Sequence, residues 1–424
     1  MTSDEAGTQQ RATLRTALRQ RDFSLVAGGQ LVSAIGDGIL PIAVTLALIA
    51  RGDGAAAIGG ALAARSLAMV VTLMVSGVVV DRFPRTYVMI GADVARVLAV
   101  LTIIWCFETG AGAGVITVVM LIFGLGEAFF RPAFRGLYPQ LVPEELLQQA
   151  NAIGSLVTRT AAIAGPALGG ILVAWWSPTA ALWIDVLTFV VSTGTLLAVR
   201  ASVRKPTAGR PTIKDFTAGL QAVRRRRWLA LTFLSGLIQM PLSVAPWFVL
   251  LPIVALDHYG DSDSYPLSMT VYAVGAIVGA MLASRIKTRS PGVPAFVGVA
   301  AFGLVMLAML ASVPAAVLVS AHFVAGVGLE VYIVLYYTAV QREVPTELLG
   351  RVTALDMMVS AALMPLGYAL VGVWAEHAGR SVVLAVGFAA CVVTTLPLLL
   401  DPQVRSLSSQ PDQPPVSTQN GADR

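Results

Sequence analysis

Residues 142–147 read Val-Pro-Glu-Glu-Leu-Leu, and residues 344–349 read Val-Pro-Thr-Glu-Leu-Leu, so one short motif occurs twice at an offset of 202 residues. Further matches at the same offset are Gly77 with Gly279, Arg85 with Lys287, Gly124 with Gly326, and Gly126 with Gly328. A single register that holds across several segments indicates duplication of a structural unit. The chain is therefore predicted to consist of two halves related by a parallel repeat.

The composition is typical of a membrane protein. The 424 residues are 56% hydrophobic and only 12% charged, and the mean hydropathy is +0.76. Soluble proteins carry about 25% charged residues, whereas one membrane-spanning helix needs about 20 mostly apolar residues. Apolar runs recur from residue 25 to residue 400, which leaves room for about a dozen such helices. We expect an all-α membrane protein with twelve transmembrane helices in two six-helix halves.

The apolar runs also predict where the spans and their connections lie. The expected spans are residues 23–50, 55–80, 87–108, 112–138, 147–175, 179–199, 228–256, 266–286, 293–312, 315–341, 350–375 and 380–400. The expected organisation is a cytoplasmic N-terminal segment at 1–22, a first half at 23–199, a basic cytoplasmic linker at 200–227, a second half at 228–400, and a disordered cytoplasmic tail at 401–424.

Basic residues predict the orientation of these spans. Of the 29 lysines and arginines, Arg51 and Arg380 fall in loops opposite the termini, Arg65, Arg96 and Arg159 fall within spans, and Arg131 is borderline. The remaining 23 lie on the side of the termini. Basic loops stay in the cytoplasm, so we expect a multi-pass plasma-membrane protein with both termini cytoplasmic. The net charge of +5 is explained by this orientation and by contact with the lipid bilayer, and not by nucleic-acid binding.

One loop carries a motif that resembles a family signature. Residues 77–85 read Gly-Val-Val-Val-Asp-Arg-Phe-Pro-Arg. This resembles the signature loop Gly-x-x-x-Asp-Arg/Lys-x-Gly-Arg of major facilitator superfamily transporters, with Pro84 in place of the second glycine. The resemblance implies a major facilitator fold and a gating motif formed by Gly77, Asp81, Arg82 and Arg85. Asp81 would face the N-terminus of the eleventh helix, where the helix dipole favours negative charge; alternatively, Asp81 only ends its own helix.

A second motif favours export. Residues 165–170 read Gly-Pro-Ala-Leu-Gly-Gly and resemble the Gly-Pro-x-x-Gly-Gly element of antiporter-type exporters in the superfamily, which implies roles for Gly165, Pro166, Gly169 and Gly170. Proline kinks a helix and glycine permits close helix contact, so ordinary helix packing is the alternative. Residues 33–37 and 143–151 look most like the enterobactin-exporter and macrolide-efflux branch.

Ionisable residues within the spans are candidates for substrate or proton binding, because each costs at least about 2.5–3.5 kcal/mol in hydrocarbon. These candidates are Asp37, Glu127, Arg65, Arg159 and Glu330. Asp37 has no evident partner on its own helix, whereas Glu127 could pair with Arg131 four residues later. Asp93 and Arg96 are expected to form a structural pair, Asp356 is a weaker candidate, and Asp185 is expected near the outer surface in contact with solvent.

These features together predict a secondary active exporter of a small amphipathic molecule, such as a drug, an antibiotic or a siderophore-like metabolite. Transport would occur by alternating access with a proton, or else sodium, as the coupling ion. Drug–proton antiporters of the superfamily resemble one another in an arginine four residues before a Gly-x-Gly in the fourth helix. Here Met120 stands in that place before Gly124 and Gly126, so this sequence departs from the pattern that such proton coupling implies. An importer of a sugar or other small metabolite is the alternative.

Other functions find little support in the sequence. There is no Gly-x-x-x-x-Gly-Lys-Ser/Thr motif for ATP, and neither a nucleophile–base arrangement nor a metal-ligand spacing is evident. We expect no enzyme activity, no cofactor and no metal, and a monomer. Aromatic residues suited to bulky apolar ligands are Trp247, Phe248, Tyr272, Tyr332, Tyr336 and Tyr337.

Overall fold

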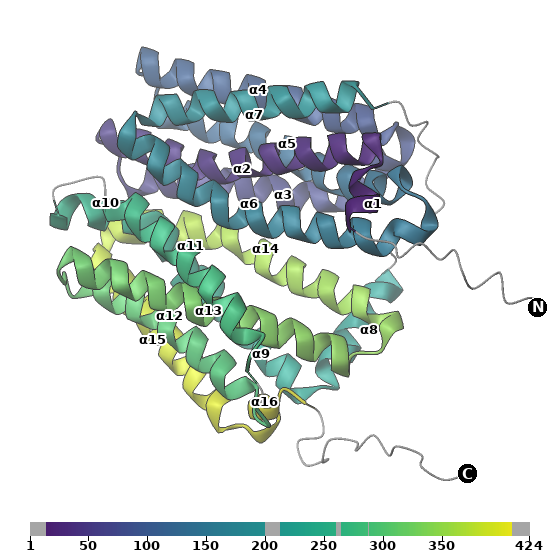
Figure 1. Ribbon diagram of the computed structural model, residues 1–424. Helices are drawn as coiled ribbons and strands as arrows, with labels where there is room; N and C mark the ends of the chain where they lie inside the picture. Colours follow the sequence, from purple (N-terminus) through teal and green to yellow (C-terminus); the bar gives the residue numbers. More distant parts are fainter. Residues whose placement is uncertain (1–13, 200–212, 260–263, 287, 409–424) are drawn as a thin grey trace, which may run out of the picture.

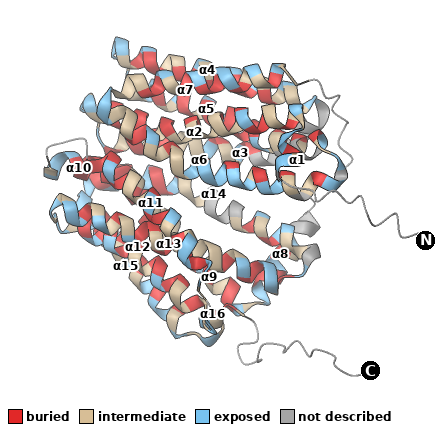
Figure 2. Ribbon diagram, viewed as in Figure 1, coloured by how far each residue is buried: buried red, intermediate tan, exposed pale blue. Residues whose placement is uncertain are grey.

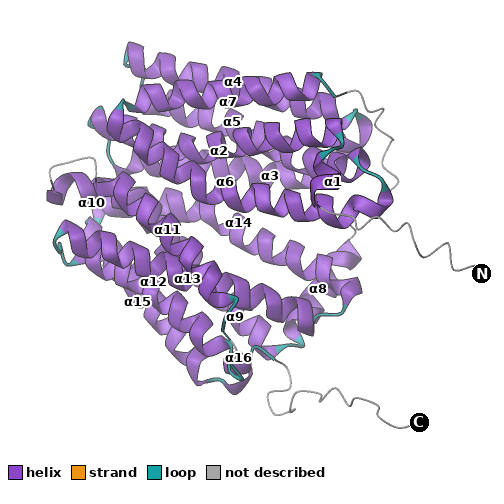
Figure 3. Cartoon of the chain, in the orientation of Figure 1, coloured by secondary structure: helices purple, strands orange, loops and turns teal. Residues whose placement is uncertain are grey.

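The computed structural model describes residues 14–199, 213–259, 264–286 and 288–408, and these are organised as helices without strands (Figures 1 and 3). The N-terminal helices are α1 (Leu14–Leu18), α2 (Arg21–Ala50), α3 (Ala55–Arg82), α4 (Arg85–Thr109), α5 (Ala113–Leu137), α6 (Leu147–Trp175) and α7 (Pro178–Leu197). The C-terminal helices are α8 (Ile213–Arg224), α9 (Arg227–Gln239), α10 (Ala245–Tyr259), α11 (Ser264–Ala283), α12 (Gly292–Leu310), α13 (Ala315–Glu343), α14 (Thr346–His377), α15 (Arg380–Leu400) and α16 (Pro402–Ser406).

The membrane-spanning character predicted from composition is confirmed. Eleven helical segments among the described residues are long and apolar enough to cross a membrane, and one of them joins α9 and α10 through a π-helical turn at Met240–Val244. The remaining expected span corresponds to α14, a helix of 32 residues. The ends of the expected spans agree with the helix ends to within a few residues. Of the expected terminal segment, linker and tail, residues 1–13, 200–212 and 409–424 lie outside the described residues.

The two halves repeat the same close helix crossings. A side chain on Gly124 of α5 would meet the backbone of α3, and one on Gly326 of α13 would meet the backbone of α11. A side chain on Gly126 would meet α4, and one on Gly328 would meet α12. These two matched pairs of glycines therefore occupy equivalent helix crossings, which confirms the parallel repeat.

The pattern of burial is that of a helix bundle in a membrane, with an apolar outer surface. Buried residues concentrate where helices face one another (Figure 2). Large apolar side chains such as Leu98, Val118, Leu156 and Trp183 are more than half exposed. A lipid-facing helix surface carries such residues at no cost, because hydrocarbon surrounds it in place of water.

The first and last described helices, α1 and α16, lie at the same end of the bundle (Figure 1), which is called the terminal face below. The two halves meet close to the opposite face. There the backbone amide of Ala56 donates a hydrogen bond of 3.1 Å to Glu376, and a side chain on Gly372 would lie 2.8 Å from Ala56 Cα. A side chain on Gly170 of α6 would lie 2.9 Å from Pro266 Cα of α11. Close backbone packing thus joins the halves at the face opposite the termini.

Candidate substrate and proton site

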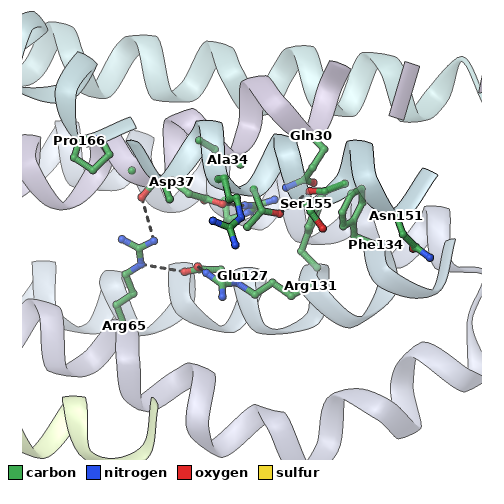
Figure 4. Close-up of a pocket in the computed structure, with 18 residues that line it drawn as sticks. Gln30, Ala34, Asp37, Arg65, Glu127, Arg131, Phe134, Asn151, Ser155 and Pro166 are labelled. Atoms are coloured by element: carbon green, nitrogen blue, oxygen red, sulfur yellow. Dashed lines mark hydrogen bonds and ion pairs between the residues drawn. The ribbon is translucent and has the colours of Figure 1, made fainter. Parts of the chain in front are cut away.

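A cavity of about 780 Å³ lies on the wall of the first half (Figure 4). Its lining residues are Gln30, Ala34, Asp37, Gly38, Arg65, Arg96, Glu127, Phe130, Arg131, Phe134, Asn151, Gly154, Ser155, Thr158, Arg159, Ala161, Ala162 and Pro166. On α6 the lining extends from Asn151, close to the terminal-face end of the helix, to Pro166. The 15 steps between these two residues correspond to about 22 Å along the helix axis, so the cavity reaches from the terminal face to the middle of the bundle.

Arg96 is the centre of the charge network in this cavity. Its Nη1 lies 2.9 Å from Asp37 Oδ1, and its Nη2 pairs with Asp93, one helical turn away on α4. The guanidinium also lies over two aromatic rings, 4.5 Å from the centroid of Phe130 and 4.3 Å from that of Phe189. Two carboxylates and two ring faces therefore stabilise the cation in a place that water does not reach.

A second set of charges adjoins the first. Arg65 Nε donates a hydrogen bond of 3.0 Å to Glu127 Oε2, and Arg65 Nη2 donates one of 3.2 Å to the Asp37 carbonyl oxygen (Figure 4). Arg131 Nη2 lies 2.5 Å from Glu127 Oε1, so the pair expected from the spacing of four residues is present. Glu127 is thus held by two arginines.

The network is balanced in charge but uneven in exposure. Its acids are Asp37, Asp93 and Glu127, and its bases are Arg65, Arg96 and Arg131. The side chain of Asp37 is 17% exposed, whereas those of Glu127 and Asp93 are 2% and 0% exposed. Asp37 is therefore the acid of this network that is most accessible from the cavity. Asp37 was expected to lack a partner on its own helix; its partner comes from another helix, because Arg96 is long enough to reach it.

The motif at residues 165–170 lies directly behind Asp37. A side chain on Gly165 would lie 2.8 Å from the Ile35 carbonyl oxygen and 2.9 Å from Gly38 Cα, so α6 crosses α2 in backbone contact. Pro166 lines the cavity at the same level. Gly169 continues this crossing along α2, and Gly170 faces α11 of the other half. The motif thus holds the helix that carries Asp37 and also reaches the interface between the halves.

Arg159 and Glu330 face each other across the halves. Arg159 Nη1 of α6 lies 3.2 Å from Glu330 Oε1 of α13, and the arginine side chain is 58% exposed. The sequence places both among the candidates, and the structure pairs them with each other and not with Glu127. An ion pair near the cavity therefore connects the two halves away from their backbone contacts.

Two other expectations need correction. Asp185 does not meet solvent: it is fully buried, and with Thr188 it occupies the space over Gly36 of α2. Counting residues along α7 indicated a position near the outer end but did not show which way the side chain points. Trp247 is packed against Phe248, Tyr272 and Phe302 in the core, so this part of the expected aromatic lining is buried.

The gating motif is only partly described. The backbone of α3 continues to Arg82, but the side chains at residues 73–82, which include Gly77, Asp81 and Arg82, lie outside the described residues. Arg85 donates a hydrogen bond to the Gly136 carbonyl oxygen, so the motif's last arginine joins the start of α4 to the end of α5. The expected contact between Asp81 and the start of α14 stays a prediction.

Three residues of the network were not among the site candidates: Asp93, Arg96 and Arg131. Asp93 and Arg96 were interpreted as a structural pair because they are three residues apart. The signal that could have identified them is charge balance, since Asp37 at a similar depth needed a cation that its own helix does not supply.

The fold and the site define a polytopic transporter with two repeated halves and a charged cavity near their interface. A family comparison agrees: residues 26–368 match the Major Facilitator Superfamily. The chain belongs to this superfamily.

Relatives of known name are distant but cover nearly the whole chain. Macrolide efflux protein A of Streptococcus pyogenes is 26% identical over 367 residues, which is 84% of this chain and 90% of that protein. Multidrug efflux pump Tap of Mycobacterium tuberculosis is 25% identical over 420 residues, which is 93% of this chain and 98% of that protein. Both agree with the branch that residues 33–37 and 143–151 indicate.

Solved structures share the fold at low sequence identity. The nucleoside transporter NupG superposes with a TM-score of 0.70 at 12% identity, covering 89% of this chain and 98% of that one. A bacterial homologue of the iron transporter ferroportin in an inward-facing state superposes with a TM-score of 0.65 at 19% identity, covering 89% and 97%. The major facilitator fold is thereby confirmed.

Proposed function

We propose that this protein is a secondary active exporter that moves small amphipathic molecules across the plasma membrane by alternating access, with inward movement of protons as the driving force. The observation that carries the proposal is the charge-balanced network on the cavity wall, in which Asp37 is the one acid that is appreciably exposed. The relatives named as macrolide and multidrug efflux proteins support export and a bulky apolar substrate. The exporter acts as a monomer.

The proposed orientation places the terminal face in the cytoplasm. The excess of basic residues on that side supports this orientation, with residues 200–227 as the cytoplasmic connection between the halves. Because the halves are joined at the opposite face and the cavity extends to the terminal face, the conformation described here is the one that loads substrate from the cytoplasm. Asp81 would then strengthen contact between the halves on the cytoplasmic side when the cavity opens outward.

Asp37 is the proposed proton carrier. In the present conformation the Asp37 carboxylate lies 2.9 Å from the Arg96 guanidinium and also lines the cavity, so it can exchange a proton with the cytoplasmic side. When the cavity opens outward, protonation of Asp37 would neutralise it and leave Arg96 paired with Asp93 alone. Glu127 is less suited to this role, because two arginines hold it and its side chain is almost inaccessible.

The test is transport by purified protein in liposomes with an imposed pH gradient and a radiolabelled macrolide. Asp37→Asn should reduce gradient-driven transport to background while exchange of substrate without a gradient persists. Glu108→Gln, which removes an exposed carboxylate at the end of α4, is the matched control and should behave as wild type. Gradient-driven transport by Asp37→Asn at the wild-type rate would exclude Asp37 as the carrier. A requirement for sodium, or import of the substrate from outside, would refute the proposed coupling ion or direction.

A further inference from the structure

A carboxylate on α14 is held by two tyrosines of α13. Tyr337 donates a hydrogen bond of 2.8 Å to Asp356 Oδ2, and Tyr336 donates one of 3.2 Å to Oδ1. Tyr332 stacks on Tyr336 with ring centroids 5.4 Å apart, and the ring of Tyr337 meets that of Tyr336 edge-on at 5.2 Å. Asp356 thus lies at the edge of a group of three phenol rings.

Asp356 differs from the acids of the cavity network. Asp37, Glu127 and Glu330 each pair with an arginine, whereas Asp356 has only its two phenol partners in the part of the chain that the structure describes. Phenols satisfy the hydrogen-bonding capacity of both oxygens but supply no compensating positive charge. An acid in a membrane-spanning helix without a cation marks a functional position.

The internal repeat shows what is missing at this position. Phe130 and Phe134 of the first half stack with an interplanar angle of 18°, and their equivalents at the offset of 202 residues, Tyr332 and Tyr336, stack at the same angle. In the first half the guanidinium of Arg96 lies over Phe130. The residue equivalent to Arg96 in the second half is Gly298. The second half therefore keeps the aromatic pair, gains a carboxylate, and has no arginine in the equivalent place.

The group is reachable from the space between the halves. Tyr337 and Glu330 are seven residues apart on α13, which is two helical turns, so they share one face of that helix. Glu330 on this face meets Arg159 of the first half. Tyr337 and Asp356 are both partly exposed. A molecule between the halves can therefore contact the carboxylate and the outermost ring.

We propose that Asp356 and Tyr337 bind the positively charged group of the transported molecule, so that the exporter prefers organic cations such as protonated tertiary amines with an apolar body. The carboxylate supplies the counter-charge and the Tyr337 ring supplies cation–π contact, while Tyr336 holds the carboxylate from the buried side. This inference rests on the proposed export function and narrows its substrate class.

The test is equilibrium binding of radiolabelled tetraphenylphosphonium, a permanently charged apolar cation, to purified full-length protein in lipid nanodiscs. Asp356→Asn should weaken binding by roughly tenfold or more, which corresponds to about 1.4 kcal/mol. Asp356→Glu should restore most of the affinity, and Glu108→Gln should leave it unchanged. Binding of neutral triphenylphosphine oxide, measured in parallel, should not respond to Asp356→Asn, and this comparison also shows that the variant is folded.

The outcomes separate this inference from the proposed function. Unchanged tetraphenylphosphonium affinity in Asp356→Asn, or equal losses for the cation and the neutral analogue, would overturn the cation site even if wild-type protein exports macrolides. Loss of cation binding in Asp356→Asn would uphold the cation site even if the wild type showed no proton-driven export in liposomes, in which case the transport proposal alone would fail.

Discussion

Replacement of Arg96 by glutamine should destabilise the first half of the protein selectively. The change leaves Asp37 and Asp93 without their shared cation, and the network then holds three acids against two bases. At an effective dielectric constant of about 20, charges 2.9 Å apart attract by about 6 kcal/mol before desolvation is counted. Removing one partner of a buried pair costs about 3–5 kcal/mol in practice. We expect a loss of stability of this size for Arg96→Gln.

The two cysteines offer an assay that separates the halves. Cys106 on α4 and Cys391 on α15 are both fully buried, so a thiol-reactive fluorophore should label each of them only after its half unfolds. Variants that keep one cysteine at a time report on one half each during a thermal ramp in detergent. Arg96→Gln should lower the labelling temperature at Cys106 more than at Cys391.

Charge balance supplies the control and the refutation. The double variant Arg96→Gln, Asp93→Asn restores equal numbers of acids and bases, so it should be more stable than Arg96→Gln alone. Arg131→Gln should have a smaller effect than Arg96→Gln, because the Arg131 side chain is 54% exposed and Glu127 keeps its ion pair with Arg65. A double variant that is less stable than the single one would refute the reasoning from charge balance.

Three further outcomes follow from the geometry of the bundle. Gly165→Leu should abolish folding or transport, because its side chain would enter the backbone of α2. Gly91→Leu on α4 is the control and should be tolerated, because its side chain would meet open space. The yield of folded protein after size-exclusion chromatography would distinguish the two variants. Gly170→Leu should prevent close contact of α6 with α11 and shift the population toward outward-open states, which spin-label distances across the face opposite the termini would detect; unchanged distances would contradict this. Reversing the charges at Arg159 and Glu330 singly should each reduce transport, and the double reversal should recover part of it if their ion pair is what matters.

The sequence was sufficient to predict the fold because its signals are long-range and redundant. Apolar runs separated by charged loops place each helix to within a few residues. The repeated glycines then relate the halves, since a glycine at a helix crossing is dictated by backbone contact and not by a local preference. Such signals survive an error at any single position.

The site could be predicted only in part, because helix rotation and side-chain reach are not encoded in spacing along one helix. Spacing identified the pairs within a helix, Glu127 with Arg131 and Asp93 with Arg96. It did not identify the pairing of Asp37 with Arg96, which join different helices. For Asp185, counting residues gave its position along α7 but not the direction in which its side chain points. A buried residue was therefore expected to contact solvent.

The repeat also shows how the halves have diverged in chemistry while keeping the same packing. At the offset of 202 residues Arg96 corresponds to Gly298, and Glu127 corresponds to Leu329. Proton exchange requires an ionisable group, and at these two positions only the first half has one. The equivalent positions of the second half are neutral, and Asp356, which has no cation partner among the described residues, lies among tyrosines instead. This asymmetry supports the proposed division of tasks, in which the first half responds to protons and the second half recognises the charge of the substrate.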